Sequence, residues 1–252
     1  MDLQLQGHRA LVTGGSKGIG RAIAESFASE GASVSICARN QEEIDAAVAA
    51  LESKGVTAFG QSVDVNDGAA LKAWIDASAE ALGGIDTIVS NVTGGNGQGD
   101  DAWRAKFEGD VLGTVRCVEN SLPYLEKSEN ASIAMISTTA ALEKFMNAGP
   151  YNAMKAAVIQ YSGALSQDLA PKGIRVNTVS PGPIFIEGGA WDNIKQNMTP
   201  FYDATLADIP IGRMGKAEEI ADQIVFLASP RGAFTTGTNI VIDGGLTKRI
   251  QF

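Results

Sequence analysis

The sequence predicts a doubly wound α/β fold, with a mostly parallel sheet of about seven strands and helices on both faces. Strand-length apolar runs alternate with stretches of helical periodicity along almost the whole chain of 252 residues. A glycine-rich turn follows the first of these runs, and no repeat, low-complexity tract or linker divides the chain. Strands joined by helices of this length form right-handed βαβ units and therefore parallel sheets. We expect residues 1–252 to form a single domain.

The first half of the chain contains four predicted strand–helix units. Their strands are expected at residues 9–13, 33–38, 57–63 and 86–90. Each is followed by apolar residues spaced three and four apart, the pattern of an amphipathic helix. These apolar helix faces are formed by Ile19, Ile23 and Phe27, then Ile44, Ala47, Val48 and Leu51, then Leu71, Trp74, Ile75 and Leu82, and finally Val111, Val115, Val118 and Leu122.

The second half continues the alternation. Strands are expected at residues 133–137, 174–179 and 239–242, with a long helix over 151–169 and another around Ile220, Ile224 and Leu227. Two stretches lack periodicity: residues 91–100, with four glycines in ten, and residues 181–210. Irregular segments of that length are more often functional than idle, so 181–210 is predicted to be the substrate loop.

Composition excludes several classes of protein. A net charge of −9 argues against nucleic-acid binding, which rewards clustered basic residues. No apolar run approaches the roughly 20 residues that span a bilayer, and residues 1–6 lack the features of a signal peptide. The two cysteines, Cys37 and Cys117, lie in apolar runs and are expected to be buried thiols. These features predict a cytoplasmic protein with no membrane partner.

The turn after the first strand reads Thr-Gly-Gly-Ser-Lys-Gly-Ile-Gly over residues 13–20. Glycines between a strand and a helix let the backbone approach a pyrophosphate at the positive end of the helix. The Gly-x-x-x-Gly-x-Gly spacing differs from the usual dinucleotide fingerprint, and no Lys-Ser/Thr pair closes it as in nucleotide triphosphatases. By itself this turn is also compatible with a purely structural role.

Tyr151 follows Gly20 by 131 residues, and Lys155 follows Tyr151 at i+4. Together with residues 13–20, this pair resembles the compact, single-domain branch of the short-chain dehydrogenase/reductase family. The likeness covers essentially the whole chain, and 3-oxoacyl-carrier-protein reductases are among the members it resembles. It implies a Rossmann-like fold, nicotinamide-dependent hydride transfer and a homo-oligomer, in this family often a homotetramer. The further motifs, in the family's order, are Asp64-Val65, Ser180-Pro181-Gly182, Arg213-Met214-Gly215, Glu218-Glu219-Ile220-Ala221 and Asp243-Gly244-Gly245.

The basic residues near the second strand favour NADP(H) over NAD. An NAD-binding fold usually ends that strand with a carboxylate, whereas residues 37–40 read Cys-Ala-Arg-Asn. Arg39 can hold a 2′-phosphate with its planar fork, and Lys17 can add a second positive charge. The alternative is that both are solvated surface cations. The residues expected to bind cofactor are Gly14, Ser16, Lys17, Gly18, Ile19, Gly20, Arg39, Asp64, Val65, Asn91, Tyr151, Lys155, Pro181, Gly182 and Ile184.

Tyr151 and Lys155 are predicted to perform the acid–base chemistry. A lysine at i+4 lies on the same helix face as the tyrosine, and its charge lowers the phenol pKa from about 10. The family's hydroxyl donor, thirteen residues earlier, corresponds to Thr138; the adjacent Ser137 must face the opposite way. The family's relay asparagine aligns with Asp110, which either couples to Lys155 or turns away and caps a helix surface.

The resulting hypothesis is a hydride transfer between NADP(H) and a carbonyl or secondary alcohol, without a metal. The alternative is a catalytically weakened nicotinamide-binding regulatory or scaffold protein; a sugar epimerase or dehydratase would need a different loop and a larger substrate domain. Oxo-acyl thioesters, cyclic ketones and polyols all remain open as substrates. The helices over 103–127 and 151–169 are apolar enough for subunit packing. An apolar pocket or an interface could be formed by Phe145, Met146, Phe185, Trp191, Met198, Phe201 and Tyr202.

Overall fold

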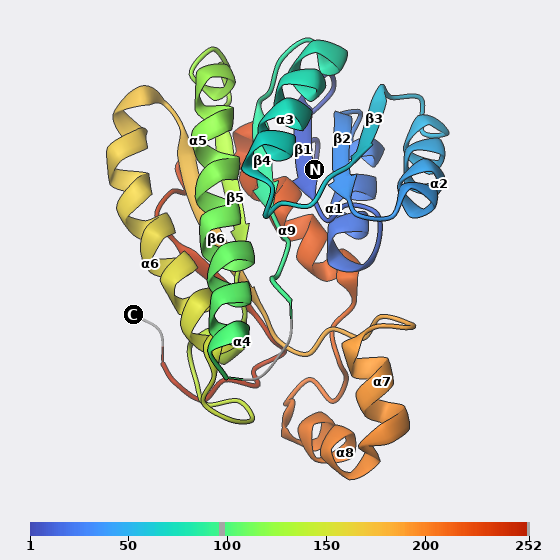
Figure 1. Cartoon of the computed structure of the whole chain (residues 1–252), viewed down its shortest axis with the longest axis vertical. Coiled ribbons are helices and arrows are strands. Elements are labelled where there is room, and N and C mark those ends of the chain that lie inside the picture. Colours follow the sequence, from blue (N-terminus) through green and yellow to red (C-terminus); the bar gives the residue numbers. More distant parts are fainter. Residues whose placement is uncertain (96–98, 251–252) are drawn as a thin grey trace.

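The computed structural model, which describes residues 1–95 and 99–250, contains one sheet of seven strands in the order β3-β2-β1-β4-β5-β6-β7 (Figure 1). Every pair of neighbouring strands among the described residues is parallel. The predicted doubly wound parallel sheet is therefore confirmed. The strands are β1 Arg9–Thr13, β2 Ser33–Ala38, β3 Ala58–Ser62, β4 Thr87–Ser90, β5 Ser132–Ile136, β6 Arg175–Pro181 and β7 Asn239–Ile242.

Helices cover both faces of this sheet (Figure 1). Side chains alternate along a strand, so Ala10 and Val12 of β1 pack in one hydrophobic cluster and Leu11 packs in the other. The first cluster includes residues of α1, α2 and α9, and the second includes residues of α3, α5 and α6. The helices are α1 Gly18–Ser29, α2 Gln41–Glu52, α3 Gly68–Leu82, α4 Gly99–Lys106, α5 Gly113–Leu125, α6 Pro150–Leu169, α7 Ala190–Asn197, α8 Thr199–Asp208 and α9 Ala217–Ala228.

The helix predicted over residues 103–127 is interrupted. A six-residue π-helical segment, η1 (Phe107–Leu112), joins α4 to α5. Gly109 of this segment lies against the loop after β4: a Cβ there would stand 2.5 Å from the Gly94 backbone, so only glycine fits. Such wide turns widen the helix locally and are frequent at functional sites. The prediction of one regular helix was wrong at this point because the cause is a contact distant in sequence.

The two aperiodic stretches differ in outcome. Residues 91–95 and 99–100 are described, whereas the rest of the predicted glycine-rich segment, residues 96–98, lies outside the described residues. The expectation that residues 181–210 form an irregular segment was wrong over α7 and α8, which Figure 1 shows below the sheet. Cys37 and Cys117 are both buried, as predicted. No helix within the described ranges has the length and apolar character to cross a membrane.

Candidate active site

The predicted site residues gather at the carboxyl edge of the sheet because parallel strands all end there. The glycine loop follows β1, Asn91 follows β4, and Thr138 follows β5. Pro181 is the last residue of β6. Residues from four separate parts of the sequence thus reach one edge, where doubly wound sheets bind their ligands.

The loop between β1 and α1 adopts a conformation that depends on glycine. Gly14 and Gly18 have φ angles of 66° and 61°, in the left-handed region that other residues avoid. A Cβ on Gly20 would collide with the carbonyl oxygen of Gly14, so the first helical turn packs directly on the loop. Asn91 supports the base of the loop: its backbone N–H donates to Thr13 Oγ1 at 2.9 Å and its Nδ2 donates to Thr13 O at 3.1 Å.

This loop fits the pyrophosphate of a dinucleotide. Lys17 occupies the N-cap of α1 and, among the described residues, no side chain caps the helix there. The backbone N–H groups of Gly18, Ile19 and Gly20 therefore lie in the first turn without side-chain acceptors, at the positive end of the helix dipole. Ser16, which precedes these groups in the loop, is buried, and the Ile19 side chain is half-buried. The donors needed for an anion are present.

The region expected to hold a 2′-phosphate contains a carboxylate that sequence reasoning missed. Glu43 of α2 accepts hydrogen bonds from Ser16 Oγ and from Lys17 Nζ, each at 3.1 Å. The bond from Lys17 is the main reason that the Glu43 pKa lies below its usual range. Glu43 therefore partly neutralises the charge of Lys17. Arg39, two residues before α2, is exposed. The available signal in the sequence was the position of Glu43, three residues after the N-cap Asn40. The Asn40 side chain accepts a hydrogen bond from the Glu43 backbone N–H.

The remaining predicted cofactor contacts follow β3. Asp64 is exposed, and its carboxylate accepts the Asn66 backbone N–H at 3.0 Å, which shapes the turn. Val65 is buried and belongs to the same hydrophobic cluster as Leu71 and Trp74. Asp64 thus faces solvent at the cofactor edge, whereas Val65 anchors the turn in the core.

Tyr151 and Lys155 lie in the first turns of α6, with Lys155 only 4% exposed. Lys155 Nζ donates to Ile136 O at 2.9 Å and pairs with Asp110 Oδ1 at 3.2 Å. Burial lowers the pKa of Lys155, although Asp110 opposes this effect. Burial also raises the pKa of Tyr151; a hydrogen bond with Thr138 lowers it and the Asp110 charge adds to the rise.

The two adjacent hydroxyls after β5 have different surroundings. Ser137 Oγ donates to the Lys155 backbone carbonyl at 2.9 Å, so it holds β5 against α6. Thr138 Oγ1 instead accepts the Ala140 N–H at 3.2 Å, as the N-cap of the short 3-10 helix η2 (Thr139–Ala141). A hydroxyl that accepts from the backbone keeps its own proton for another acceptor. Thr138 is therefore the one of the two placed to donate beside Tyr151.

Asp110 is fully buried, so the alternative that it turns away to a helix surface is wrong. Its Oδ1 pairs with Lys155 and accepts the Gly94 N–H at 3.3 Å. Its Oδ2 finds no hydrogen-bond partner among the described residues. A buried carboxylate needs a positive neighbour to stay ionised.

A second lysine that sequence reasoning missed, Lys106, is also buried beside Asp110. The signal in the sequence was the i, i+4 spacing of Lys106 and Asp110.

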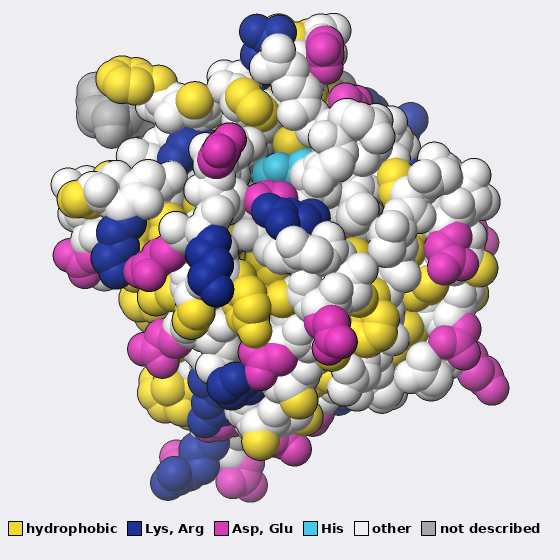
Figure 2. Space-filling view, turned by 90° about the horizontal axis from the view of Figure 1, so that it is seen from above, with side chains coloured by type: hydrophobic (Ala, Val, Ile, Leu, Met, Phe, Trp, Pro, Cys, Tyr) yellow, Lys and Arg dark blue, Asp and Glu magenta, His cyan; other side chains and the backbone are white. Residues whose placement is uncertain are grey.

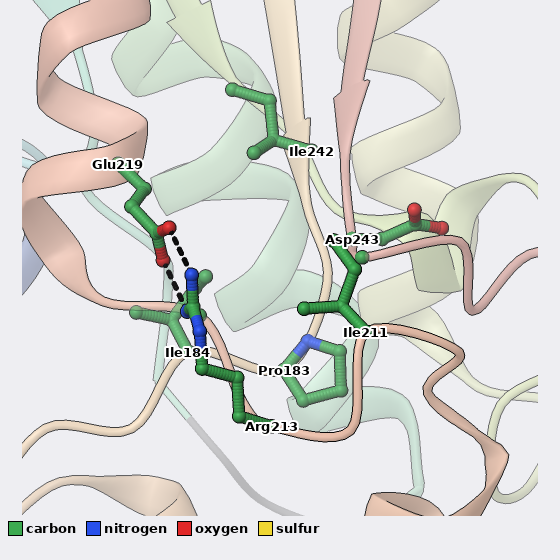
Figure 3. A pocket seen from close by; sticks show the side chains of 9 residues that line it. Pro183, Ile184, Ile211, Arg213, Glu219, Ile242 and Asp243 are labelled. Atoms are coloured by element: carbon green, nitrogen blue, oxygen red, sulfur yellow. Dashed lines mark hydrogen bonds and ion pairs between the residues drawn. The ribbon is translucent and has the colours of Figure 1, made fainter.

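The C-terminal motifs support the loop that contains Pro181 and Gly182. Gly182 N–H donates to Ile242 O at 2.9 Å, and a Cβ on Gly182 would lie 2.6 Å from the Asp243 side chain. Ile184 forms an isolated bridge with Gly215. Figure 3 shows the pocket behind this loop, where Arg213 points to Glu219 and pairs with it at 2.6 Å. These motifs therefore hold the backbone of the loop, and Ile184 is buried by them.

Aromatic side chains join α7 and α8 to the loop after η2. The Phe145 ring lies 6.0 Å from Trp191 of α7 and 6.0 Å from Phe201 of α8. Trp191 and Phe201 stack with centroids 6.1 Å apart, and Tyr202 meets Trp191 edge-on. We call Phe145, Trp191, Phe201 and Tyr202 the aromatic cluster. The sequence left open whether these residues line an apolar pocket or form an interface. Within one chain, the four rings of the aromatic cluster pack on each other.

A parallel doubly wound sheet with a glycine loop between β1 and α1 is the architecture of dinucleotide-binding α/β proteins. A family model described as enoyl-(acyl carrier protein) reductase matches residues 14–247. The isoepoxydon dehydrogenase of Penicillium expansum is 39% identical over 254 residues, covering 98% of this chain and 98% of that protein. The chain belongs to the short-chain dehydrogenase/reductase family.

Solved structures agree with this assignment. An NADPH-bound short-chain oxidoreductase of Pseudomonas aeruginosa PAO1, described as containing an atypical catalytic center, has a TM-score of 0.88 and 33% identity, covering 96% of this chain and 98% of its own. The L-sorbose reductase of Gluconobacter frateurii, in complex with NADPH and L-sorbose, has a TM-score of 0.90 and 30% identity, covering 99% of this chain and 100% of its own. The family resemblance seen in the sequence is therefore confirmed.

Proposed function

We propose that this chain is an NADP(H)-dependent oxidoreductase that interconverts a carbonyl and a secondary alcohol. The observation that carries the proposal is the placement of Tyr151, Lys155 and Thr138 together at the edge of the sheet that also holds the glycine loop. The solved relatives bound to NADPH support the choice of nucleotide. Arg39 and Lys17, with no carboxylate at the end of β2, support it from this chain's own residues.

When bound, the nicotinamide supplies or accepts the hydride. In the reducing direction Tyr151 donates its phenolic proton to the substrate oxygen, and Thr138 donates a hydrogen bond to the same oxygen. The Lys155 ammonium stabilises the resulting phenolate. Backbone N–H groups of the glycine loop and the first turn of α1 hold the pyrophosphate, while Arg39 binds the 2′-phosphate.

The substrate is proposed only as a class. The relatives named above act on an isoepoxydon and on L-sorbose, according to their names, and both names denote compact oxygenated molecules. Trp191, Phe201 and Tyr202 of the aromatic cluster lie on the segment 181–210, which would cover such a substrate. We therefore favour a small cyclic ketone or polyol over a long acyl thioester as the first substrates to test.

We further propose that the protein is a cytoplasmic homo-oligomer, in keeping with the family's tetramers. Trp103 and Phe107, at the α4–η1 junction, remain 45% and 44% exposed and border a surface hollow with Met154 of α6. Exposed aromatic side chains on neighbouring helices are typical of a subunit contact. Light scattering on the full chain measures its state of assembly.

The test of the catalytic role is the Tyr151→Phe variant. It removes one hydroxyl, so NADPH binding should persist while turnover of a responsive ketone falls by roughly 10² or more. Fluorescence titrations with NADPH and NADH should show tighter binding of the first in both proteins. Unchanged turnover in a folded variant would refute the role of Tyr151, and a wild type that binds NADPH but turns over no ketone or alcohol would favour the regulatory or scaffold alternative.

A further inference from the structure

Lys106 is a second buried lysine beside the candidate acid–base. Only 5% of it is exposed, and its Nζ donates to Gly94 O at 2.6 Å and to Thr93 Oγ1 at 3.2 Å. The same nitrogen lies 5.2 Å from the centroid of the Tyr151 ring. Lysine is almost never this buried unless it is paired. Nothing in the proposed chemistry so far uses it.

Three buried ionisable side chains form a connected group on the elements next to Tyr151. Lys106 ends α4, Asp110 lies on η1 one turn later, and Lys155 lies on α6. Asp110 pairs with Lys155 at 3.2 Å, and its charge also acts on Lys106. The other charged residues of α4, Asp100, Asp101 and Arg104, are exposed. Among the described residues of α4, η1 and the first turns of α6, the buried charged side chains are therefore those of Lys106, Asp110 and Lys155.

The charges of Asp110 and Lys106 act on the Tyr151 phenol in opposite directions. The Asp110 carboxylate opposes the field that Lys155 exerts on a phenolate. The Lys106 ammonium restores one positive charge, and a cation above an aromatic face is attracted more strongly when the ring carries negative charge. With both residues present the net buried charge is the same as for Lys155 alone.

We propose that Lys106 is a positioning residue for proton transfer, whose ammonium offsets the Asp110 carboxylate so that Tyr151 can ionise. This inference rests on the proposed role of Tyr151 as acid–base. The proposal separates Lys106 from a purely structural lysine, which would serve only to hold Thr93 and Gly94. The two roles make different demands, since one needs a charge and the other needs a hydrogen-bond donor.

A set of variants at position 106 distinguishes charge from hydrogen bonding. Lys106→Gln retains an amide donor without charge, and Lys106→Met has neither. If the charge matters, both should move the pH profile of alcohol oxidation upward by on the order of one to two pH units. If only the hydrogen bonds matter, Lys106→Gln should match the wild type. That result would overturn the proposal.

The Asp110→Asn variant completes a double-mutant cycle with Lys106→Met. Alone it should move the profile to lower pH, because it leaves two ammonium groups uncompensated. Combined with Lys106→Met it should return the profile to within a few tenths of a unit of the wild type, because the net charge is restored. A double variant that retains the whole upward shift of Lys106→Met would contradict charge compensation.

Ultraviolet difference titration gives a second readout that needs neither substrate nor nucleotide. The ionisation of Tyr151 is obtained by subtracting the titration of the matching Tyr151→Phe protein, and it should shift in the same direction as the pH profile. Lys127→Gln is the control, because exposed Lys127 lies 5.8 Å from the Tyr124 ring and should shift neither measurement. Loss of turnover in Tyr151→Phe with no shift at position 106 would refute this inference alone; retained turnover would refute the proposed function first.

Discussion

At the scale of single residues, two carboxylates, Glu43 and Asp110, set the charge of the candidate site. The carboxylates of Glu43 and Asp110 each accept from a lysine that could otherwise act on a ligand or on the tyrosine. Glu43 is half-exposed, whereas Asp110 is fully buried. Screening by water weakens the first pair and leaves the second strong. We expect Glu43 to modulate binding and Asp110 to affect chemistry.

The Glu43→Gln variant should bind NADPH about three- to tenfold more tightly than the wild type. The carboxylate occupies Ser16 Oγ and Lys17 Nζ, which are donors available to a 2′-phosphate, and it repels that phosphate. NADH lacks the phosphate, so its affinity should change little. Fluorescence titration with both nucleotides measures the difference.

Glu42→Gln is the matched control, since Glu42 lies in the same first turn of α2 and is exposed. It removes the same charge without touching Ser16 or Lys17. Equal gains in NADPH affinity for both variants would show that the effect is a general change of surface charge. An equal gain for NADH would show that Glu43 does not act on the 2′-phosphate.

At the scale of elements, periodicity was sufficient to locate the strands and most helices, because burial on one face repeats locally along the chain. The π-helical η1 could not be predicted, since it depends on Gly109 meeting Gly94 across the fold. Lys106 and Glu43 were missed for the same reason, because their partners are set by packing between elements. The packing of α4 against the loop after β4 and against α6 sets the partners of Lys106. The packing of α2 against the glycine loop sets those of Glu43. Tyr151, Lys155 and Thr138 were predicted as site residues only because their spacing matches a known family.

The aromatic cluster should control how firmly α7 and α8 cover the sheet edge. Trp191→Ala removes the ring that contacts Phe145, Phe201 and Tyr202, so the two helices should open more often. We expect several-fold faster limited proteolysis within residues 185–210 and a higher KM for the carbonyl substrate. The affinity for NADPH should stay constant, because the glycine loop lies elsewhere.

Met198→Ala serves as the control for this element. Met198 joins α7 to α8 and is 46% exposed, so its removal opens little packing. Proteolysis that accelerates equally in both variants would indicate general loosening of the segment. A change in global unfolding that matches the change in proteolysis would show that the cluster stabilises the whole fold rather than the two helices.

At the scale of the whole molecule, the amino edge of the sheet has a polar cluster of its own, opposite the site. His8 Nε2 and Thr87 Oγ1 are 2.8 Å apart, and Arg9 Nε donates to Asp86 Oδ2 at 2.7 Å. In Figure 2 the chain's single histidine, drawn in cyan, lies next to an acidic side chain, with a basic side chain close by. The Thr87 hydroxyl also bonds Ser132, so the cluster links β1, β4 and β5. It joins the two halves of the sheet.

This cluster should make global stability depend on pH. Burial lowers the pKa of His8 from 6.5 to about 4, with Asp86 opposing the change. A histidine whose folded pKa is depressed binds its proton more readily when unfolded, so stability is present above pH 6.5 and is lost as pH falls toward 4. Between pH 7 and pH 4.5 this group alone should remove about 2–3 kcal/mol from the free energy of unfolding.

The His8→Gln variant tests this contribution, because glutamine can still bond Thr87 but does not titrate. Urea unfolding at about pH 7 and about pH 4.5 should show a loss of stability in the variant that is smaller by about 2–3 kcal/mol than in the wild type. Asp86 is present in both proteins. Burial acts to raise the pKa of Asp86, but its bonds with Arg9 and Ser128 lower that pKa overall. Both proteins should therefore share the loss of stability that protonation of Asp86 causes in acid. The same loss in both would assign the acid sensitivity to Asp86 and the other carboxylates, and would mean that His8 is protonated in the folded state at the same pH as in the unfolded chain.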